Sequence, residues 1–182
     1  QILSRDRRIG FLGLGRLGSA CAETLKGFGF QVAGWSRSDK NLPGIESYSG
    51  EDGLFTLLER SDILVCLLPL TPETEDILDA TTLGALPRGA VLINAARGKH
   101  IVDQDLLETL RNGQISHATL DVYREEPLPA DHPFWKHPKV IMYPHAAAWT
   151  LPQSASAVIA DNIRRARDGR ELVGQIDILR NY

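Results

Sequence analysis

The fold is decided by residues 9–18, which read IGFLGLGRLG in a sequence of 182 residues. The apolar run at residues 9–12 predicts a buried strand, and the amphipathic segment that follows the glycines predicts a helix. Between them, Gly13 permits a tight turn, Gly15 lets a pyrophosphate approach the backbone, and Gly18 lets the helix pack closely on the strand. The stretch therefore predicts a dinucleotide site whose phosphates lie at the N-terminus of the helix.

The composition indicates one domain with a sizeable core and a short appendage. The hydrophobic content is 43% and the net charge is −3, so no basic field recruits nucleic acid or an anionic membrane. The longest apolar run, Ile63 to Leu70, is too short to span a bilayer. Cys21 and Cys66 lie in apolar segments, which favours buried free thiols in a reducing compartment over a disulfide. We therefore expect a cytoplasmic protein that binds neither membrane nor nucleic acid.

Short apolar runs alternate with amphipathic segments along the chain, which is typical of βαβ units. We expect an α/β fold, a doubly wound parallel sheet of the Rossmann type, whose ligands bind beyond the carboxyl ends of the strands. Asp103 is expected to cap a helix that stops at Gly113. The expected strands are Arg8–Leu12, Gln31–Trp35, Ile63–Leu67, Ala90–Asn94, Ala118–Val122 and Val140–Met142, and the expected helices are Arg16–Gly27, Glu51–Glu59, Ala80–Leu86, Asp103–Arg111 and Leu151–Asp168.

The second expected strand ends in the stretch WSRSDK at residues 35–40. In NAD-binding folds an acidic residue near this point holds the ribose hydroxyls. Ser36 carries no charge that would repel a 2′-phosphate, and Arg37, Ser38 and Lys40 can donate hydrogen bonds to one. The sequence therefore predicts a preference for NADP(H), with NAD(H) as the second option, and the alternative is an ordinary polar surface turn.

Polar side chains also follow three later strands. Arg97 comes after the strand at residues 90–94, and its planar guanidinium can grip a carboxylate. Glu125 and Glu126 follow the next expected strand, and His145 follows the last one. Parallel strands end at one edge of a sheet, so these groups are expected beside the dinucleotide. A histidine held as imidazolium by a carboxylate can donate a proton there, although the residues alone do not choose between the two glutamates.

Taken together, these motifs resemble the D-isomer-specific 2-hydroxyacid dehydrogenase family over nearly the whole chain. The resemblance is carried by GLGRLG at 13–18, LPLTPET at 68–74, NAARG at 94–98, LDVYREEPLP at 120–129 and PHAAAWT at 144–150. It implies an enzyme that reduces a small 2-keto acid to the 2-hydroxy acid with a nicotinamide cofactor. The segments ARGKHIVDQDLL, WSRS and HPFWKHPKV are most similar to the family's glyoxylate and hydroxypyruvate reductases.

The resemblance also implies a role for each residue of the site. Arg97 would bind the carboxylate and carbonyl oxygen of the substrate, and His145 would protonate that oxygen as hydride arrives. Glu126 would pair with His145 and keep it protonated, which leaves Glu125 as a solvated bystander. Asp121 would contact the nicotinamide carboxamide. The full set of implied cofactor contacts is Gly13, Gly15, Arg16, Leu17, Gly18, Trp35, Ser36, Arg37, Ser38, Leu68, Pro69, Thr74, Ala95, Asp121 and Ala147.

The family places a substrate-binding domain ahead of this sheet, and the resemblance implies that this domain is absent from the chain. We therefore expect a dinucleotide-binding domain at residues 1–150 and a helix with a tail at 151–182 that would return to the missing domain. The ending from Gly174 to Tyr182 resembles a family terminus. The last helix would carry an apolar face without a partner, which favours oligomerisation. A homodimer is what the family implies.

Two other functions stay open at this point. The first is a non-catalytic dinucleotide-sensing module of the same fold, and the second is a glycine-rich methyltransferase-type fold. The set of Arg97, Glu126 and His145 counts against both, because neither function needs it.

The remaining histidines favour structural roles. His132 and His137 each stand before a proline, with no cysteine near them, so we expect no metal site. His100 follows the turn of Arg97, which allows a position near the crevice, but we expect it at the surface.

Overall fold

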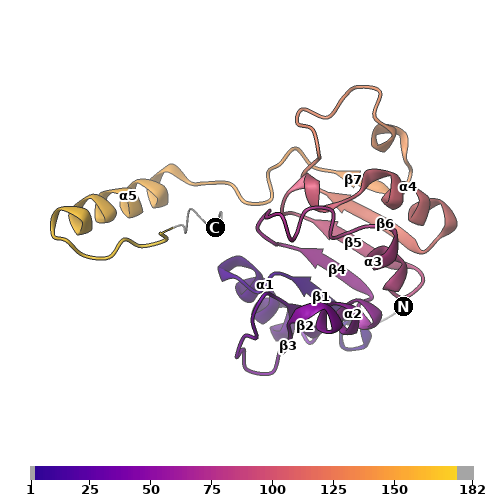
Figure 1. Cartoon of the computed structure of the whole chain (residues 1–182), viewed down its shortest axis with the longest axis horizontal. Coiled ribbons are helices and arrows are strands. Elements are labelled where there is room, and N and C mark those ends of the chain that lie inside the picture. Colours follow the sequence, from indigo (N-terminus) through magenta and orange to yellow (C-terminus); the bar gives the residue numbers. More distant parts are fainter. Residues whose placement is uncertain (1–2, 176–182) are drawn as a thin grey trace. The chain divides into compact units, whose positions relative to one another are not determined.

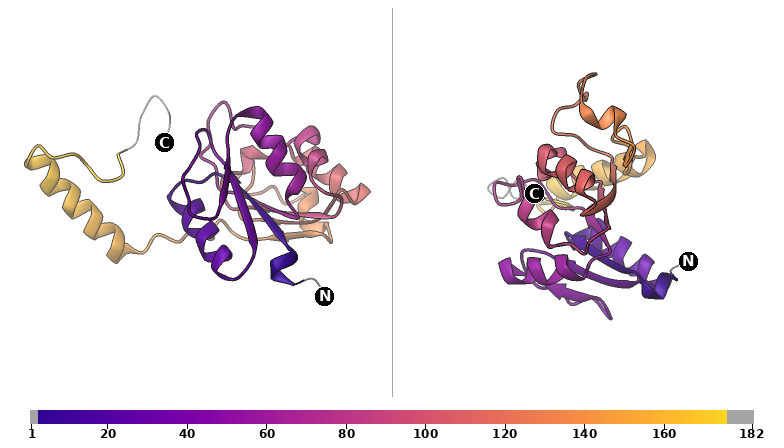
Figure 2. Two further views of the ribbon diagram at one scale, coloured as in Figure 1. Left: turned by 90° about the horizontal axis from the view of Figure 1, so that it is seen from below. Right: turned by 90° about the vertical axis from the view of Figure 1, so that its right-hand side faces the viewer.

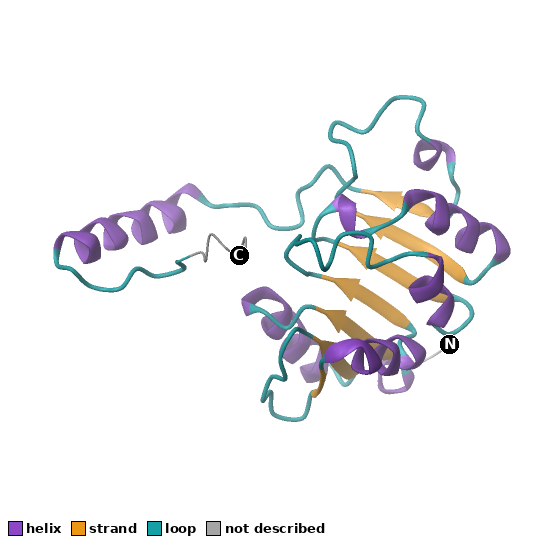
Figure 3. Ribbon diagram, viewed as in Figure 1, coloured by secondary structure: helices purple, strands orange, loops and turns teal. Residues whose placement is uncertain are grey.

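The computed structural model describes residues 3–175. Their strands form a seven-stranded sheet in the order β3-β2-β1-β4-β5-β6-β7, and every pairing is parallel (Figures 1 and 3). The chain steps outward from β1 on one side and from β4 on the other, which confirms the predicted doubly wound α/β fold. The strands are β1 Arg8–Leu12, β2 Gln31–Trp35, β3 Glu46–Tyr48, β4 Ile63–Cys66, β5 Ala90–Asn94, β6 Ile115–Leu120 and β7 Val140–Met142.

Helices pack on both faces of the sheet (Figure 2). α1 (Arg16–Gly27) lies against β1 and β2 on one face. On the other face α2 (Gly50–Arg60) contacts α3 (Ala80–Ala85), which contacts α4 (Asp103–Asn112). Three short 3₁₀ turns complete this part of the chain: η1 (Ser4–Asp6), η2 (Gly98–His100) and η3 (Pro133–Lys136).

Each face of the sheet buries its own apolar cluster, because successive residues of a strand point to opposite faces. Ile9 and Phe11 of β1 join Ala22 of α1 in the smaller cluster. Leu12 of β1 joins Leu57 of α2 in the larger one, which extends across β4, β5 and β6 to α4. The turn between β1 and α1 is therefore anchored by a strand that is buried on both sides.

Beyond a one-residue shift at the end of β4, which stops at Cys66, two strands differ from the sequence-based expectation. β3 was not expected, because its residues Glu-Ser-Tyr contain no apolar run and pair only with β2 at the edge of the sheet. β6 begins at Ile115, three residues before the expected start, because Ile115 and His117 still pair with β5, and it ends at Leu120, two residues before the expected end. In both cases hydrogen bonding to a neighbouring strand decides the element, and hydropathy does not report it.

The predicted cap of α4 is wrong. Val102 occupies the cap position, and Asp103 is the first helical residue. The Asp103 carboxylate lies 3.4 Å from Nε2 of His132 instead, so a tertiary contact takes the side chain away from the helix end. Burial raises the pKa of Asp103, and the charge of His132 opposes that shift. Gly113 ends the helix in a left-handed conformation with φ of 79°, as predicted.

The described chain falls into two compact units, of which the second begins at Ala146. The second unit contains α5 (Pro152–Arg167), a helix with no buried residue. Val158, Ile159 and Ile163 expose apolar side chains on it. The ending expected from Gly174 to Tyr182 lies outside the described residues after Gln175. No helix within residues 3–175 is both long and apolar enough to cross a membrane.

A pH dependence of stability is predicted by the ion pair between β1 and the start of β4. Arg8 donates to the Asp62 carboxylate from its backbone N–H at 2.9 Å and from its guanidinium at 2.7 Å, and the side-chain bond is the main cause that lowers the pKa of Asp62. A carboxylate whose folded pKa is lowered adds stability above its unfolded pKa, and this contribution is lost as the pH falls through the folded value. Asp62→Asn should cost about 1 kcal/mol at pH 7, allowing for solvent screening. Its unfolding free energy should also fall less steeply below pH 4 than that of the wild type. Urea unfolding at a series of pH values measures both effects, and equal acid slopes for the two proteins would contradict the prediction.

Candidate active site

The turn between β1 and α1 contains two positions that exclude a side chain. Gly13 has φ of 101°, and a Cβ on it would lie 2.8 Å from the carbonyl oxygen of Leu67. A Cβ on Gly18 would collide with the carbonyl group of Gly13. Gly15 differs, because open space surrounds the place of its missing side chain, directly ahead of the first turn of α1. The turn therefore leaves room for an anion at Gly15, where the N–H groups of a helix N-terminus favour negative charge.

The end of β2 lies beside this turn. The backbone N–H of Gly13 donates to the carbonyl oxygen of Trp35 at 2.8 Å. Ser36 is buried, and its hydroxyl donates to the carbonyl oxygen of Ser38 at 2.8 Å. Arg37 is exposed, as are Ser38 here and the first two residues of α1, Arg16 and Leu17. The position where a carboxylate would repel a phosphate therefore carries a neutral hydroxyl, followed by a cation.

The loop after β4 is closed by the side chain of Thr74. Its hydroxyl donates to the carbonyl oxygen of Pro69 at 2.7 Å and accepts from the backbone N–H of Thr71 at 2.9 Å. Leu68, Thr71 and Thr74 are buried. The hydrogen bond from Thr71 is the main cause that lowers the pKa of Glu73, and the charge of Arg37 adds to it. The loop at residues 68–74 is thus a compact element, and its Glu73 interacts electrostatically with Arg37 at the end of β2.

The turn after β5 presents Arg97. Fully buried Asn94 donates from its side chain to the carbonyl oxygen of Arg97 at 3.0 Å and accepts from the backbone N–H of Ala96 at 3.1 Å. A Cβ on Gly98 would collide with the backbone of Tyr123. The turn is therefore pressed against the loop after β6, and the side chain of Arg97 is exposed at their junction.

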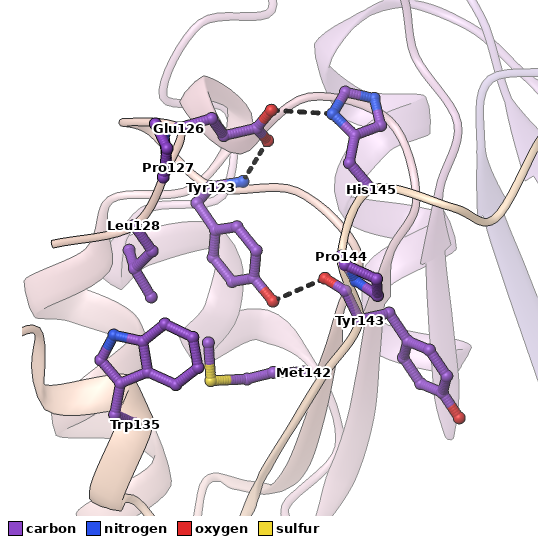
Figure 4. Close-up of a pocket in the computed structure, with 9 residues that line it drawn as sticks. All are labelled: Tyr123, Glu126, Pro127, Leu128, Trp135, Met142, Tyr143, Pro144 and His145. Atoms are coloured by element: carbon purple, nitrogen blue, oxygen red, sulfur yellow. Dashed lines mark hydrogen bonds and ion pairs between the residues drawn. The ribbon is translucent and has the colours of Figure 1, made fainter. Parts of the chain in front are cut away.

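Glu126 links the loop after β6 to the segment after β7. One of its carboxylate oxygens accepts from the backbone N–H of Tyr123 at 2.9 Å, and the other lies 2.8 Å from Nδ1 of His145 (Figure 4). The Tyr123 hydroxyl donates to the carbonyl oxygen of Tyr143 at 2.9 Å and joins the same two segments again. His145 has φ of 56°, a strained backbone that persists only where surrounding contacts hold it.

The electrostatics of this pair favour an ionised carboxylate. Desolvation raises the pKa of Glu126 and is the largest single effect on it. The hydrogen bonds from His145 and from the backbone of Tyr123, together with the charges of His145 and Arg97, outweigh it and leave the pKa below its ordinary value. An ionised carboxylate next to an imidazole stabilises the protonated ring, which is the form that can donate a proton.

A cleft of about 210 Å³ brings the three polar residues together. Arg97, Glu126 and His145 line it, and Leu70 from the loop after β4 forms part of its wall. A larger hollow of about 380 Å³ also reaches Glu126 and His145, but its other walls are mainly apolar and include Met142 (Figure 4). The smaller cleft is the candidate active site, because a guanidinium and an imidazole paired with a carboxylate line one space there.

Other residues expected in the site lie near it without lining the cleft. Asp121 is buried at the same sheet edge, and its backbone N–H donates to the carbonyl oxygen of Asn94 at 3.0 Å. Ala95 follows that asparagine in the turn after β5. Glu126, rather than Glu125, faces His145, which settles the choice that the residues alone left open. Ala147, which was also expected to contact the cofactor, belongs to the second compact unit.

Two residues of structural importance were not singled out from the sequence, and a third was placed wrongly. Asn94 shapes the turn of Arg97, and Tyr123 joins the two segments that hold Glu126 and His145. The surface position expected for His100 is wrong, since its side chain is fully buried beneath the loop at residues 68–74. A polar residue at the end of a buried strand signals Asn94, but hydropathy contains no signal for the other two.

The fold and the glycine turn define a nucleotide-binding domain of the Rossmann type. Residues 3–147 match the family model of the D-isomer specific 2-hydroxyacid dehydrogenase, NAD binding domain, and the chain belongs to that family.

Curated relatives and solved structures agree with this assignment. The chain is 48% identical to a glyoxylate/hydroxypyruvate reductase A of Escherichia fergusonii, over 97% of this chain and 57% of the relative. A D-isomer specific 2-hydroxyacid dehydrogenase from Xanthobacter autotrophicus Py2, in complex with NADPH and MES, aligns with a TM-score of 0.97 at 43% identity, over 100% of this chain and 75% of that one.

A third relative is an NADPH-dependent glyoxylate/hydroxypyruvate reductase from Sinorhizobium meliloti, solved in complex with NADP and sulfate. It aligns with a TM-score of 0.96 at 38% identity, over 100% of this chain and 59% of that chain. The chain thus spans somewhat more than half the length of the curated relatives that it matches.

The contact between Gly98 and Tyr123 predicts a large loss of stability on substitution. A methyl group at residue 98 would overlap the backbone of Tyr123, so Gly98→Ala must separate the turn of Arg97 from the loop after β6. We expect a loss of about 2–3 kcal/mol in unfolding free energy.

Gly84→Ala is the matched control, because open space surrounds residue 84 and it lies within α3. Alanine is the better helix former, so this variant should keep or slightly raise the stability. Urea unfolding of the three proteins compares them, and equal midpoints for Gly98→Ala and the wild type would contradict the overlap.

Proposed function

We propose that this chain is the NADP(H)-binding and catalytic part of a reductase for small 2-keto acids of the glyoxylate and hydroxypyruvate class. The observation that carries the proposal is the cleft in which Arg97, Glu126 and His145 meet at the carboxyl edge of the sheet. The printed functions of the relatives from Escherichia fergusonii and Sinorhizobium meliloti support it. The alternative, a non-catalytic dinucleotide-sensing module, gives no reason for a hydrogen-bonded carboxylate and histidine beside a cation.

The chain's own residues fit a dinucleotide. Gly13 and Gly18 leave no space for a side chain, whereas a Cβ on Gly15 would stand in open space at the N-terminus of α1. That opening suits a pyrophosphate, which needs close approach to the backbone N–H groups. The remaining cofactor contacts are proposed along the loops after β1, β2, β4, β5 and β6, as the family motifs imply. When bound, the cofactor supplies hydride to the substrate carbon.

The protein residues then divide the remaining work of the reduction. Arg97 grips the carboxylate of the keto acid with its planar guanidinium and orients the carbonyl group. His145 donates a proton to the carbonyl oxygen, so that no alkoxide has to form in water. Glu126 holds the His145 ring through Nδ1 at 2.8 Å, which leaves Nε2 as the nitrogen for the substrate. Asp121 is proposed to contact the carboxamide of the nicotinamide.

Preference for NADP(H) is proposed from the end of β2. Ser36 contributes no negative charge, and the exposed Arg37 and Ser38 can reach a 2′-phosphate. The solved structures that hold NADPH or NADP support the proposal, because this chain aligns with them over its full length.

Substitution of Arg37 tests the cofactor preference. We expect Arg37→Ser to weaken NADPH binding to this chain about tenfold, because one charge-assisted phosphate contact is lost, and to leave NADH binding nearly unchanged. Asp39→Asn, at an exposed position two residues further on, is the control and should bind both cofactors no more weakly than the wild type. Fluorescence titration of each variant with NADPH and NADH measures the dissociation constants. Equal or tighter binding of NADH by the wild type would remove the assignment.

Substitution of His145 tests the reaction. Because the chain spans about 57% of its curated relatives, we expect it to bind NADPH yet reduce glyoxylate poorly unless a substrate-binding domain is supplied. In a version extended by that part of a relative, His145→Ala should lower turnover by roughly 10²–10⁴ while the dissociation constant for NADPH stays within about twofold. Glu125→Gln is the control and should keep turnover. Full-rate NADPH oxidation by the unextended chain, or normal turnover of His145→Ala in the extended version, would contradict the scheme. NADPH binding by the extended version without any turnover would favour the sensing module.

Assembly and location are also proposals. A homodimer is what the family implies, and exposed apolar side chains such as Ile141 of β7 and Tyr143 after it are compatible with one. A reducing, cytoplasmic location agrees with two free cysteines, of which Cys66 is buried so deeply that its pKa is raised to about 12. Light scattering coupled to size-exclusion chromatography measures the mass of the chain in solution.

A further inference from the structure

His100 is a fully buried histidine whose two ring nitrogens both face carbonyl oxygens. Nδ1 lies 3.0 Å from the carbonyl oxygen of Thr74, and Nε2 lies 3.0 Å from that of Leu68. Both distances are those of ordinary N–H···O hydrogen bonds. The ring therefore lies between the first and last residues of the loop at residues 68–74 and contacts the backbone of both.

The chemistry of the imidazole restricts which form can make both bonds. A neutral ring carries one N–H and one lone pair, and a carbonyl oxygen offers only lone pairs. In the neutral form one of the two contacts would therefore set a nitrogen lone pair against an oxygen at 3.0 Å. Only the ring with a proton on each nitrogen donates to both carbonyl groups.

The loop held in this way is also joined to the turn that carries Arg97. His100 belongs to η2, the 3₁₀ turn that begins at the residue after Arg97. The backbone N–H of Asp76 donates to the carbonyl oxygen of Lys99 at 2.9 Å, and the backbone N–H of Leu78 donates to the backbone carbonyl oxygen of His100 at 2.9 Å. The ring and these backbone bonds together fix the distance between the loop and the turn.

The charged side chains of the surrounding elements have partners other than the His100 ring. Lys99 lies 3.9 Å from the carboxylate of Glu75, and Arg124 pairs with Asp76. Glu73 takes a hydrogen bond from Thr71, and the guanidinium of Arg97 donates to the carbonyl oxygen of Ala96 at 2.6 Å. The bonding partners of the His100 ring are therefore carbonyl dipoles, whose oxygens suit a ring that donates twice.

We propose that His100 is a positioning residue that carries a proton on both ring nitrogens and clamps the loop at residues 68–74 against the turn of Arg97. The loop includes Leu68, Pro69 and Thr74, which the proposed function assigns to the nicotinamide half of the cofactor, and the inference rests on that function for its effect on binding. The clamp itself is a property of the chain without cofactor.

Nitrogen-15 spectra of the imidazole rings test the clamp directly in the cofactor-free chain. With ¹⁵N-histidine labelling and His100→Gln for assignment, both nitrogens of His100 should show the chemical shifts of protonated ring nitrogens at pH 7. A pair of shifts with one protonated and one bare nitrogen would overturn the double donation. The result does not depend on NADPH binding, so failure of the proposed function leaves this measurement decisive.

Loop order and cofactor affinity test the consequence. In His100→Gln the amides of Thr74 and Glu75, which donate to the carbonyl oxygen of Thr71, should exchange at least tenfold faster with solvent. The dissociation constant for NADPH should rise about tenfold, and it should rise further in His100→Leu, because glutamine keeps a donor and leucine has none.

A stability control separates positioning from simple weakening of the fold. Ile115→Val trims a buried side chain at the amino end of β6, far along the strand from the site, and should lower the melting temperature with neither effect on the loop. Unchanged amide exchange in His100→Gln, or an equal loss of NADPH affinity in Ile115→Val, would overturn the positioning role. If the wild type binds no NADPH, the proposed function fails, and the exchange measurement still decides the clamp.

Discussion

Parallel pairing of the strands is the constraint on which the site depends. Because each strand of the sheet runs in the same direction, the loops that follow β1, β2, β4, β5, β6 and β7 all emerge at one edge. Those loops then meet only because the backbone lacks side chains at particular places. Gly13 lies against Leu67, and Gly98 lies against Tyr123, so glycine sets the spacing between neighbouring loops. Hydrophobic burial on both faces holds the strands in register, and the glycines transmit that order to the edge.

Polar side chains that hydrogen-bond to their neighbours set the directions of the side chains at this edge. Asn94 shapes the turn of Arg97, and Glu126 holds both the backbone of Tyr123 and the ring of His145. His100 spans the loop at residues 68–74. Each of these groups hydrogen-bonds to backbone atoms where the sheet ends. The exposed side chain of Arg97 therefore belongs to a turn whose backbone is held by hydrogen bonds from buried Asn94. A site with a preorganised geometry requires such an arrangement.

Much of the fold was predictable from residues alone, and the exceptions share one cause. Hydropathy and glycine placement predicted β1, β2, β5 and β7 with their bounds, because each of these strands is a largely apolar run. β3 and the start of β6 were missed, since polar residues there become strand through pairing with a neighbour. Asp103 was predicted as a cap, but its contact with His132 comes from a segment almost 30 residues away in the chain. His100 was expected at the surface, because no local sequence pattern indicates that the loop at residues 68–74 will cover it.

The sequence by itself determined the class of the protein and the residue types of its site. Glycines at residues 13, 15 and 18 need a strand–turn–helix, and the motifs around Arg97, Glu126 and His145 carry the family resemblance, because these are local patterns. Only the tertiary structure decided that Glu126 rather than Glu125 meets His145, and that His100 lies beneath the loop after β4. Those outcomes depend on where separate loops meet in space. Such meetings are set by strand order, by glycine contacts between backbones and by hydrogen bonds across long stretches of chain.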